Sequence, residues 1–420
     1  MKKQIKFPDY KWVIVFISGL MVFTVLGFCS SANSMYIAPI TEALGITRSS
    51  YSLTTSVRYV TTAVVNVFFG ALIYRFGAKK LIIAGFVSLI ISQLIYSFSD
   101  NVIHFSLGSV FLGIGLSFTT TAMVGAVVNK WSKSNKGTVM GVILATNGVG
   151  AAVARMILTP IINSGDVFGY RTSYRTVSLI LLSVLTVMIL FFRDGRPGEA
   201  TKFEVKSKKP AGDGRIFKRP CFYAALVCIF LTGLVLQSIS GIADPHLRDN
   251  GVDLNVITFM MSLHAILLSV AKFSTGFIYD RCGIRIASGI CYTAALVGML
   301  SLALTDSSAV GTVLGFTYGA FSSIALPLET IMLPIFAREL FGEEHFNRAL
   351  GIFVSVNTAG YALGGPIANL VFDLTGSYDP WIFISVALIG AVAILMNGVL
   401  TVSKRYKDAE LTQDRVGSAL

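Results

Sequence analysis

Charged residues are scarce in this chain. Asp, Glu, Lys and Arg make up 13% of its 420 residues, whereas 54% are hydrophobic. The mean hydropathy is +0.72. Soluble domains carry about 25% charged residues, which cover their surface. The composition therefore excludes an ordinary soluble protein and indicates one that spans a membrane.

Residues suited to metal binding and catalysis are also few. The five cysteines are scattered in or beside apolar segments: Cys29, Cys221, Cys228, Cys282 and Cys291. The four histidines are equally dispersed: His104, His246, His264 and His345. Neither set has metal-ligand spacing, and the sequence contains no ATP-binding glycine-rich loop. We therefore expect no metal, no cofactor and no enzymatic activity, and interpret the cysteines as small apolar packing residues.

Twelve apolar segments are long enough to cross a bilayer, which takes about 20 helical residues. Their apolar runs are continuous rather than alternating, so helices are favoured over a β-barrel. The fold class expected is an all-α membrane protein of twelve transmembrane helices. The predicted spans are 12–39, 51–74, 80–98, 104–129, 138–164, 174–192, 220–248, 254–279, 285–305, 309–334, 347–371 and 380–402.

One hydrophilic segment, Arg193–Arg219, divides these spans into two groups of six. It is rich in Lys, Arg, Gly and Pro and is too short to be a domain, which is typical of a linker. The predicted organisation is a six-helix bundle at 1–192, a linker at 193–219, a second bundle at 220–402 and a tail at 403–420.

The distribution of basic residues predicts the orientation. With a cytoplasmic N-terminus, about 27 of the 34 lysines and arginines fall in cytoplasmic segments, as the positive-inside rule requires. The termini and the linker are therefore expected in the cytoplasm, with the protein in the cell (plasma or inner) membrane. The net charge of +12 then reflects topology and contact with anionic lipid. Nucleic-acid binding is not expected, because no soluble basic domain is present.

The two halves of the sequence repeat one another. Phe68–Lys80 (FFGALIYRFGAKK) aligns with Ser274–Ile286 (STGFIYDRCGIRI) at a separation of 206 residues. Residues 140–153 (MGVILATNGVGAAV) align with residues 350–363 (LGIFVSVNTAGYAL) at a separation of 210. Parallel six-span repeats of this kind resemble the plan of the major facilitator superfamily. Such repeats place the substrate site between the halves, near the middle of the bilayer.

Three motifs extend the resemblance to monocarboxylate transporters and their bacterial oxalate–formate antiporter-like relatives. Residues 9–16 (DYKWVIVF) resemble that family's entry to the first span, and residues 129–141 (NKWSKSNKGTVMG) its basic loop between spans four and five. Residues 349–379 (ALGIFVSVNTAGYALGGPIANLVFDLTGSYD) resemble its eleventh-span signature, the most specific of the three. The resemblance runs over residues 10–174 and 217–400, and it implies transport of a small monocarboxylate by alternating access.

Lys272 is the first candidate for substrate binding, because a charge inside a span costs roughly 2.5–3.5 kcal/mol on insertion scales. The family has an arginine at this position that binds the substrate carboxylate, so the resemblance implies the same role for Lys272. A lysine that extends to the cytoplasmic interface is the alternative. The family's acidic partner becomes Leu268, and the first-span lysine of many animal members becomes Ser34. Proton coupling by the animal mechanism is therefore not implied.

Further cations and polar residues lie within the predicted spans. Arg155 is too deep in its span to extend easily to the interface, so we expect it to face the cavity. Arg58 could equally extend to the surface. Asn147 and Asn357 could contact substrate or bond between helices. Thr119 and Thr120 fall where the family has polar substrate contacts, although hydroxyls also bond to their own helix.

Two residues could balance or carry charge. Glu329 is the clearest acidic residue inside a span, and it could neutralise Lys272 or Arg155, or take up a proton during the cycle. His264 occupies the place in the second half that Arg58 has in the first. A packing role that depends on hydrogen bonds is the alternative to a coupling role for this histidine.

The repeated basic turns carry the candidates for a cytoplasmic gate. Asp280 and Arg281 could latch helices together in one state of the cycle, with Arg75 as the counterpart in the first half. A fixed interfacial ion pair is the alternative.

The function expected is secondary transport of a lactate- or pyruvate-like anion, by symport, antiport or facilitated diffusion. The partners expected are this anion, protons if transport is proton-coupled, and membrane lipid. A dicarboxylate or oxalate–formate exchanger is an alternative within the same class. A carboxylate sensor without transport is an alternative of another class, but sensors usually append a signalling domain.

Overall fold

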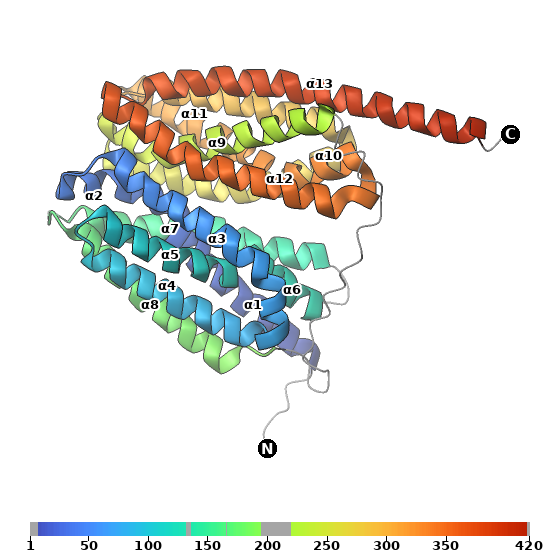
Figure 1. Cartoon of the computed structure of the whole chain (residues 1–420). Coiled ribbons are helices and arrows are strands. Elements are labelled where there is room, and N and C mark those ends of the chain that lie inside the picture. Colours follow the sequence, from blue (N-terminus) through green and yellow to red (C-terminus); the bar gives the residue numbers. More distant parts are fainter. Residues whose placement is uncertain (1–6, 132–135, 165, 195–219, 418–420) are drawn as a thin grey trace.

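The computed structural model describes residues 7–131, 136–164, 166–194 and 220–417. All regular structure in this part of the chain is helical (Figure 1). The elements are α1 Phe7–Leu26, η1 Gly27–Ser31, η2 Asn33–Tyr36, α2 Ile37–Leu44, α3 Arg48–Phe76, α4 Ala78–Phe98, α5 Val102–Thr119, α6 Thr121–Trp131, α7 Lys136–Ile162, α8 Gly169–Phe191, α9 Pro220–Asp249, α10 Leu254–Ala303, α11 Ala309–Ala325, η4 Leu326–Glu329, α12 Met332–Thr375 and α13 Asp379–Gly417.

The prediction of an all-α protein with twelve spans is confirmed. Among the described residues, eleven helical segments are long and apolar enough to cross a membrane. One of these, Leu254–Ala303, is 50 residues long and contains a non-helical residue, Gly283. Division at Gly283 gives twelve spans in place of eleven. These spans leave most of their outward-facing apolar side chains exposed, as a surface in contact with lipid requires.

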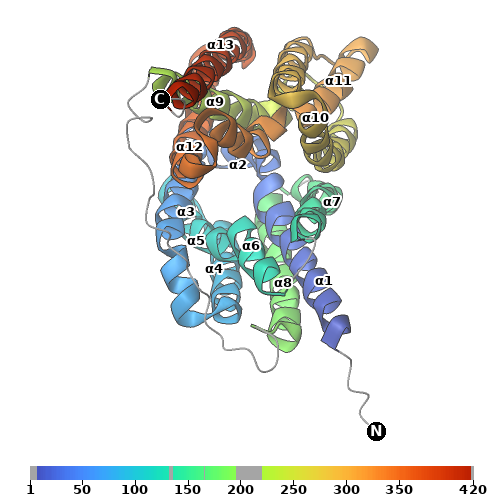
Figure 2. The ribbon, with the colours of Figure 1, turned by 90° about the vertical axis from the view of Figure 1, so that its right-hand side faces the viewer.

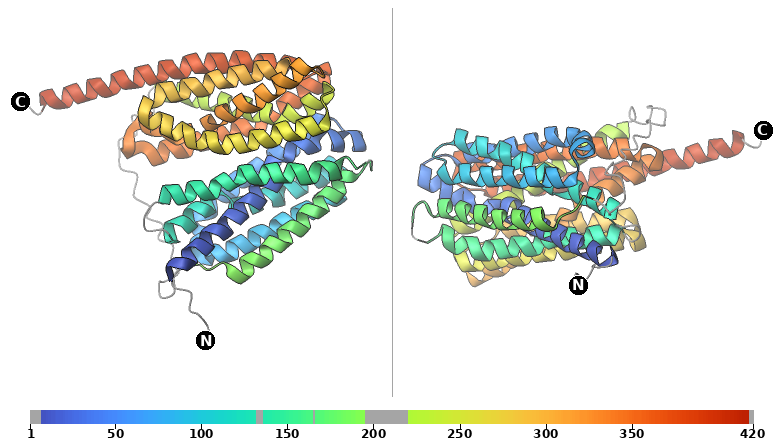
Figure 3. Two further views of the ribbon diagram at one scale, coloured as in Figure 1. Left: turned by 180° about the vertical axis from the view of Figure 1, so that it is seen from behind. Right: turned by 90° about the horizontal axis from the view of Figure 1, so that it is seen from below.

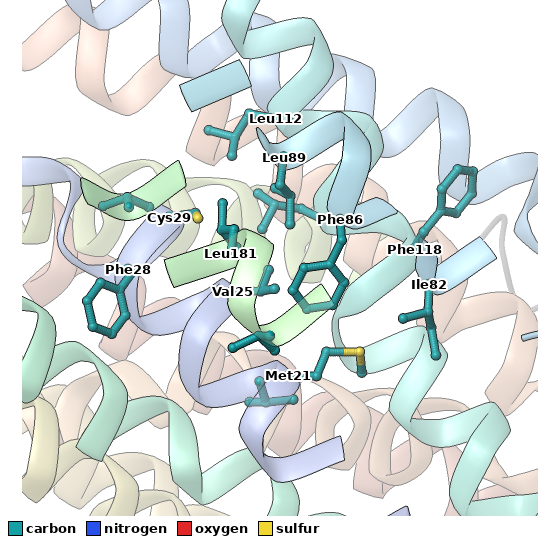
Figure 4. Close-up of a cluster of buried hydrophobic side chains, with 14 of the residues drawn as sticks. Met21, Val25, Phe28, Cys29, Ile82, Phe86, Leu89, Leu112, Phe118 and Leu181 are labelled. Atoms are coloured by element: carbon teal, nitrogen blue, oxygen red, sulfur yellow. The ribbon is translucent and has the colours of Figure 1, made fainter. Parts of the chain in front are cut away.

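Each half of the chain has its own hydrophobic core. One cluster of buried side chains runs from Ile14 to Phe192, and the other from Phe222 to Leu400. Figure 4 shows part of the first, where Met21, Val25 and Phe86 come together. Figure 2 looks along the helices, with α9–α13 above and most of α1–α8 below. The predicted linker lies almost wholly outside the described residues, and α13 continues beyond the bundle (Figure 3).

The repeated basic turns have one shared geometry. Gly77 has φ +80° and Gly283 has φ +79°, a conformation that glycine adopts without steric cost. Two residues later in each copy, a basic side chain bonds to the last helix of its own half. Lys79 Nζ donates to the Ile189 carbonyl at 2.8 Å, and Arg285 Nη2 donates to Thr401 at 3.0 Å. The turn thus fixes the start of the following span within each half.

The second repeat is explained by close helix crossings. A Cβ on Gly360 would lie 2.5 Å from the Phe230 carbonyl oxygen of α9. In the first half, a Cβ on Gly27 would lie 2.5 Å from the carbonyl carbon of Gly150. Gly150 and Gly360 are matched in the sequence repeat, so each half uses the same glycine to bring two backbones together.

The two halves touch at one end of the molecule. Helices α3 and α12 pack together, as do α7 and α10, and the polar contacts between halves that involve described residues cluster toward the end with the Gly45 and Gly251 turns. We call this the turn end. The opposite end, where α1 begins, α8 ends and α9 begins, is the terminal end. The turn end lies at the left in Figure 1.

These crossings predict which glycines tolerate a methyl group. Gly150→Ala and Gly360→Ala should each lower the melting temperature of the purified protein, because overpacking a tight contact costs roughly 1–3 kcal/mol. Gly141 and Gly351 lie on the same two helices with nothing within 4 Å of their added Cβ. Gly141→Ala and Gly351→Ala are therefore the controls and should leave the melting temperature unchanged or slightly raised. Equal effects in both sets would contradict the assigned crossings.

Candidate binding cavity between the two halves

A cavity of about 230 Å³ lies between the two halves. It is lined from the first half by the first span, α3 and α7, and from the second half by α9, α10, the η4 region and α12. The polar residues that line it are Ser30, Ser31, Ser34, Tyr59, Asn147, Arg155, Gln237, Ser240, His264, Ser269, Lys272, Glu329, Thr330 and Tyr361. The sequence-based candidates Lys272, Arg155, Asn147, His264 and Glu329 are thus brought to one place.

Two interruptions of helical geometry border this cavity. In the first span, a π-helix at Gly27–Ser31 is followed by a 3₁₀-helix at Asn33–Tyr36. In the tenth span, a 3₁₀-helix occupies Leu326–Glu329. Irregular backbone is tolerated at membrane depth only where protein or a water-filled cavity surrounds it. Discontinuous helices of this kind form the substrate sites of transporters. Neither interruption was predicted from the sequence, although the serine-rich run after Gly27 was a signal for the first.

Lys272 is the cation of this cavity that has no close partner. It lies on α10 and is half-buried, whereas its neighbours Val270 and Phe273 are exposed on the outside of the helix. No hydrogen bond or ion pair joins its ammonium group to another described residue. Glu329 faces the same cavity from the η4 helix, and no ion pair joins the two. The position of Lys272 is that of a side chain available to an anion.

Glu329 is buried, with 7% of its surface exposed. Its Oε1 atom has no hydrogen-bond partner among the described residues. A buried polar atom without a partner is costly, so this carboxyl group is expected to acquire one when a proton or a ligand enters.

Arg155 is already neutralised, and the residue responsible is not Glu329. Its Nη1 and Nη2 atoms donate to the two carboxylate oxygens of Asp244 on α9, at 2.7 and 3.0 Å. Ser34 completes the cluster, because it accepts from Arg155 Nη2 at 3.0 Å and donates to Asp244. All three are buried, and the pair joins the two halves. Asp244 was not among the residues predicted from the sequence; it precedes a proline near the predicted end of its span.

Other ion pairs join the halves at the turn end. Arg48 at the start of α3 bonds to both carboxylate oxygens of Asp249, at 2.5 and 2.8 Å. Asp373 accepts from the Arg48 and Ser49 backbone amides at 3.2 and 2.9 Å, which caps α3 from the opposite half. Arg248 and Glu42 form a further pair at 3.1 Å. The turn end is therefore closed by charge-assisted contacts.

Arg58 and His264, which are pseudo-equivalent in sequence, lie in different surroundings. Arg58 lines a neighbouring cavity of about 80 Å³ rather than the main one. Its Nε and Nη1 atoms lack hydrogen-bond partners among the described residues, and its guanidinium lies 4.5 Å from the Tyr59 ring. His264 Nδ1 lies 2.9 Å from the Gly319 carbonyl oxygen, so this ring is anchored to α11.

The remaining polar candidates differ in position. Asn147 lines the cavity and accepts from Ser31 at 3.1 Å. The structure does not bring Asn357, Thr119 or Thr120 to it. Asn357 is buried against Gly233. The two threonine hydroxyls donate to carbonyls one turn earlier in their own helix, at 2.7 and 2.8 Å, so they have no free donor for a substrate.

The expected latch at the terminal end is not formed here. Asp280, Arg281 and Arg75 are exposed and make no ion pair with a described residue. Arg281 lies over the Phe277 ring at 4.3 Å and Arg75 over the Phe76 ring at 5.4 Å. A latch between the halves would need this end to close, which is the reverse of the conformation described.

Comparison with known proteins agrees with this architecture. Residues 13–243 and 225–417 match the family model described as Major Facilitator Superfamily, and the chain belongs to that superfamily. It is therefore a multi-pass membrane transporter. The solved structure of the nucleoside transporter NupG has a TM-score of 0.74 at 14% identity and covers 94% of this chain and 98% of its own.

Two curated relatives are similar over most of their length. The sialic acid transporter NanX of Escherichia coli (strain K12) is 23% identical, over 89% of this chain and 90% of NanX. Monocarboxylate transporter 2 of Homo sapiens is 22% identical, over 88% of this chain and 82% of the human protein. Relatives named as monocarboxylate transporters thus bear out the resemblance drawn from the motifs.

The Arg155–Asp244 pair should hold the turn end closed. Loss of one partner of a buried ion pair costs roughly 3–5 kcal/mol, so Asp244→Asn should shift the population toward conformations with a separated turn end. Spin labels at the exposed Val167 and Val310, in a background without the native cysteines, would report the distance between the halves. We expect an added, longer distance in the variant.

Asp306 provides the control for this experiment. It lies in an exposed turn at the same end and bonds only within its own half, to Ser308. Asp306→Asn should leave the distance distribution unchanged. An unchanged distribution in Asp244→Asn as well would mean that this ion pair does not determine closure.

Proposed function

We propose that this member of the Major Facilitator Superfamily carries a small organic monocarboxylate across the cell membrane by alternating access, with Lys272 as the group that binds the carboxylate. The observation that supports this most strongly is an unpaired ammonium group in a cavity between the halves, bordered by two interrupted helices. The names of the two relatives point to the same chemistry, because sialic acid and monocarboxylates both carry a carboxylate.

The charge balance favours a monoanion. Asp244 occupies the carboxylate-binding face of Arg155, so Lys272 supplies the free positive charge of the main cavity. Neutralisation of that charge by one carboxylate removes the cost of a partly desolvated cation. A dicarboxylate or oxalate–formate exchanger would need a second cation, and the candidate is Arg58 in the neighbouring cavity. That alternative is favoured only by the unpartnered atoms of Arg58.

Transport requires the halves to exchange their contacts. In the proposed cycle, the anion enters from the terminal end. We propose that this end and both termini lie in the cytoplasm, which the positive-inside distribution supports. Binding at Lys272 links α10 to groups on the first span. The halves then rock about the bound anion.

This motion exchanges the contacts between the halves. At the turn end, two ion pairs separate: Arg48–Asp249 and Arg155–Asp244. At the terminal end, Asp280 and Arg281 approach the other half.

The Lys272 assignment predicts a charge requirement. Counterflow in proteoliposomes with lactate, pyruvate, formate, oxalate and acetate should show exchange of monocarboxylates by the parent protein. Lys272→Ala should abolish it, and Lys272→Arg should keep part of it, because charge supplies most of the attraction while guanidinium geometry differs. Lys80→Ala, an exposed residue of α4 outside the cavity, is the matched control. Normal exchange by Lys272→Ala would mean that this lysine does not bind the substrate and instead extends to the membrane interface. Binding without exchange in the parent would support a sensor.

Glu329 determines whether net transport is coupled to protons in this proposal. If its carboxyl group carries a proton, Glu329→Gln should leave exchange intact and abolish uptake driven by a pH gradient. If it instead balances Lys272, the same change should raise the affinity for dicarboxylates relative to monocarboxylates. Both assays on one preparation distinguish these roles. Parent-like behaviour in both would reduce Glu329 to a packing residue.

A further inference from the structure

We infer that the substrate is a polyhydroxylated monocarboxylate, bound through its carboxylate at Lys272 and through its hydroxyl groups at serine and threonine side chains beside the two helix interruptions. This inference rests on the proposed function and narrows its substrate class.

The cavity wall is unusually polar for a small-molecule site. Ten of the twenty residues that line it are Ser, Thr, Tyr, Asn or Gln, and only three of the apolar residues, Met261, Leu268 and Leu326, are large. Small-molecule pockets are usually lined predominantly by hydrophobic and aromatic side chains. An acid with an alkyl chain would leave the polar groups of this wall without partners. That loss strongly disfavours a ligand that lacks the matching hydroxyls.

Three serine and threonine hydroxyls of this wall are free to bind a ligand. Most serines and threonines of the spans bond to a carbonyl of their own helix, as Thr119 and Thr120 do. Ser30, Ser240 and Thr330 make no side-chain hydrogen bond to any described residue, and all three line the cavity. Each offers one donor and two acceptor positions. Such groups match alcohol groups, which both donate and accept.

These three hydroxyls come from both halves and line the same cavity as Lys272. Ser30 belongs to the π-helix of the first span, and Ser240 lies on α9. Thr330 follows the 3₁₀-helix of the tenth span directly. A substrate with a carboxylate at one end and several hydroxyls along its length can contact Lys272 and both halves at once. A short acid with a single polar end cannot.

The cavity volume is consistent with this reading. About 230 Å³ corresponds to roughly seven or eight water molecules at ~30 Å³ each. Waters that bond these hydroxyls are displaced without loss only by ligand groups that reproduce their hydrogen bonds. Hydroxyl groups do so, whereas methylene groups do not.

Two series of acids test the inference by competition for counterflow in proteoliposomes. Propionate, lactate and glycerate share three carbons and carry no, one and two hydroxyls. Hexanoate and gluconate each have six carbons; hexanoate carries no hydroxyl group and gluconate carries five. We expect the apparent affinity to rise roughly three- to tenfold with each of the first hydroxyls added, because a net hydrogen bond is worth this factor. Gluconate should compete best of the five.

Side-chain variants assign the effect to the named hydroxyls. Ser30→Ala, Ser240→Ala and Thr330→Val should each weaken glycerate and gluconate roughly three- to tenfold and leave propionate unchanged. Thr317→Val and Ser355→Ala are matched controls, because these exposed hydroxyls bond to their own helices outside the cavity. If propionate and hexanoate compete as well as their hydroxylated counterparts, the inference is wrong, although the proposed carboxylate transport is still supported. No exchange with any acid would overturn the proposed function itself.

Discussion

The hydrocarbon layer of a bilayer offers no water to satisfy a charge or a free backbone group, and this constraint governs every irregular feature of the molecule. An unpaired charge or an interrupted helix persists there only where protein or a water-filled cavity covers it. The π-helix at Gly27–Ser31, the 3₁₀-helix at Leu326–Glu329 and the ammonium of Lys272 all border one cavity between the halves. The costly features of this fold therefore coincide with its proposed binding site.

The same constraint explains how charge is distributed over the two ends. At the turn end, two ion pairs join the halves: Arg48 with Asp249, and Arg155 with Asp244. At the terminal end the halves are apart, and Arg281 has no carboxylate partner among the described residues. Among the described residues, the ion pairs between the halves lie at the turn end, and such pairs bias the molecule toward one of two arrangements. A carrier needs both arrangements, so these pairs must be strong enough to form and still able to separate.

Much of this could be predicted from the sequence. Apolar runs of about 20 residues form membrane helices rather than soluble structure, so the twelve spans followed from composition and length. The repeat at Gly77 and Gly283 predicted two equivalent turns because only glycine adopts that φ without cost. Pairings between halves could not be predicted, since they depend on how two separate bundles meet. Asp244 was not among the predicted residues, because nothing local in the sequence indicates its pairing with Arg155. Thr120 was predicted as a substrate contact, but its hydroxyl donates to a carbonyl of its own helix.

The position of a bound carboxylate tests the central claim most directly. A structure of the protein determined experimentally with gluconate, at the resolution needed to place a carboxylate, would provide it. The account predicts the carboxylate within about 2.7–2.9 Å of Lys272 Nζ, with Arg155 still paired to Asp244. A carboxylate bound at Arg58, or at Arg155 in place of Asp244, with Lys272 unoccupied, would contradict it.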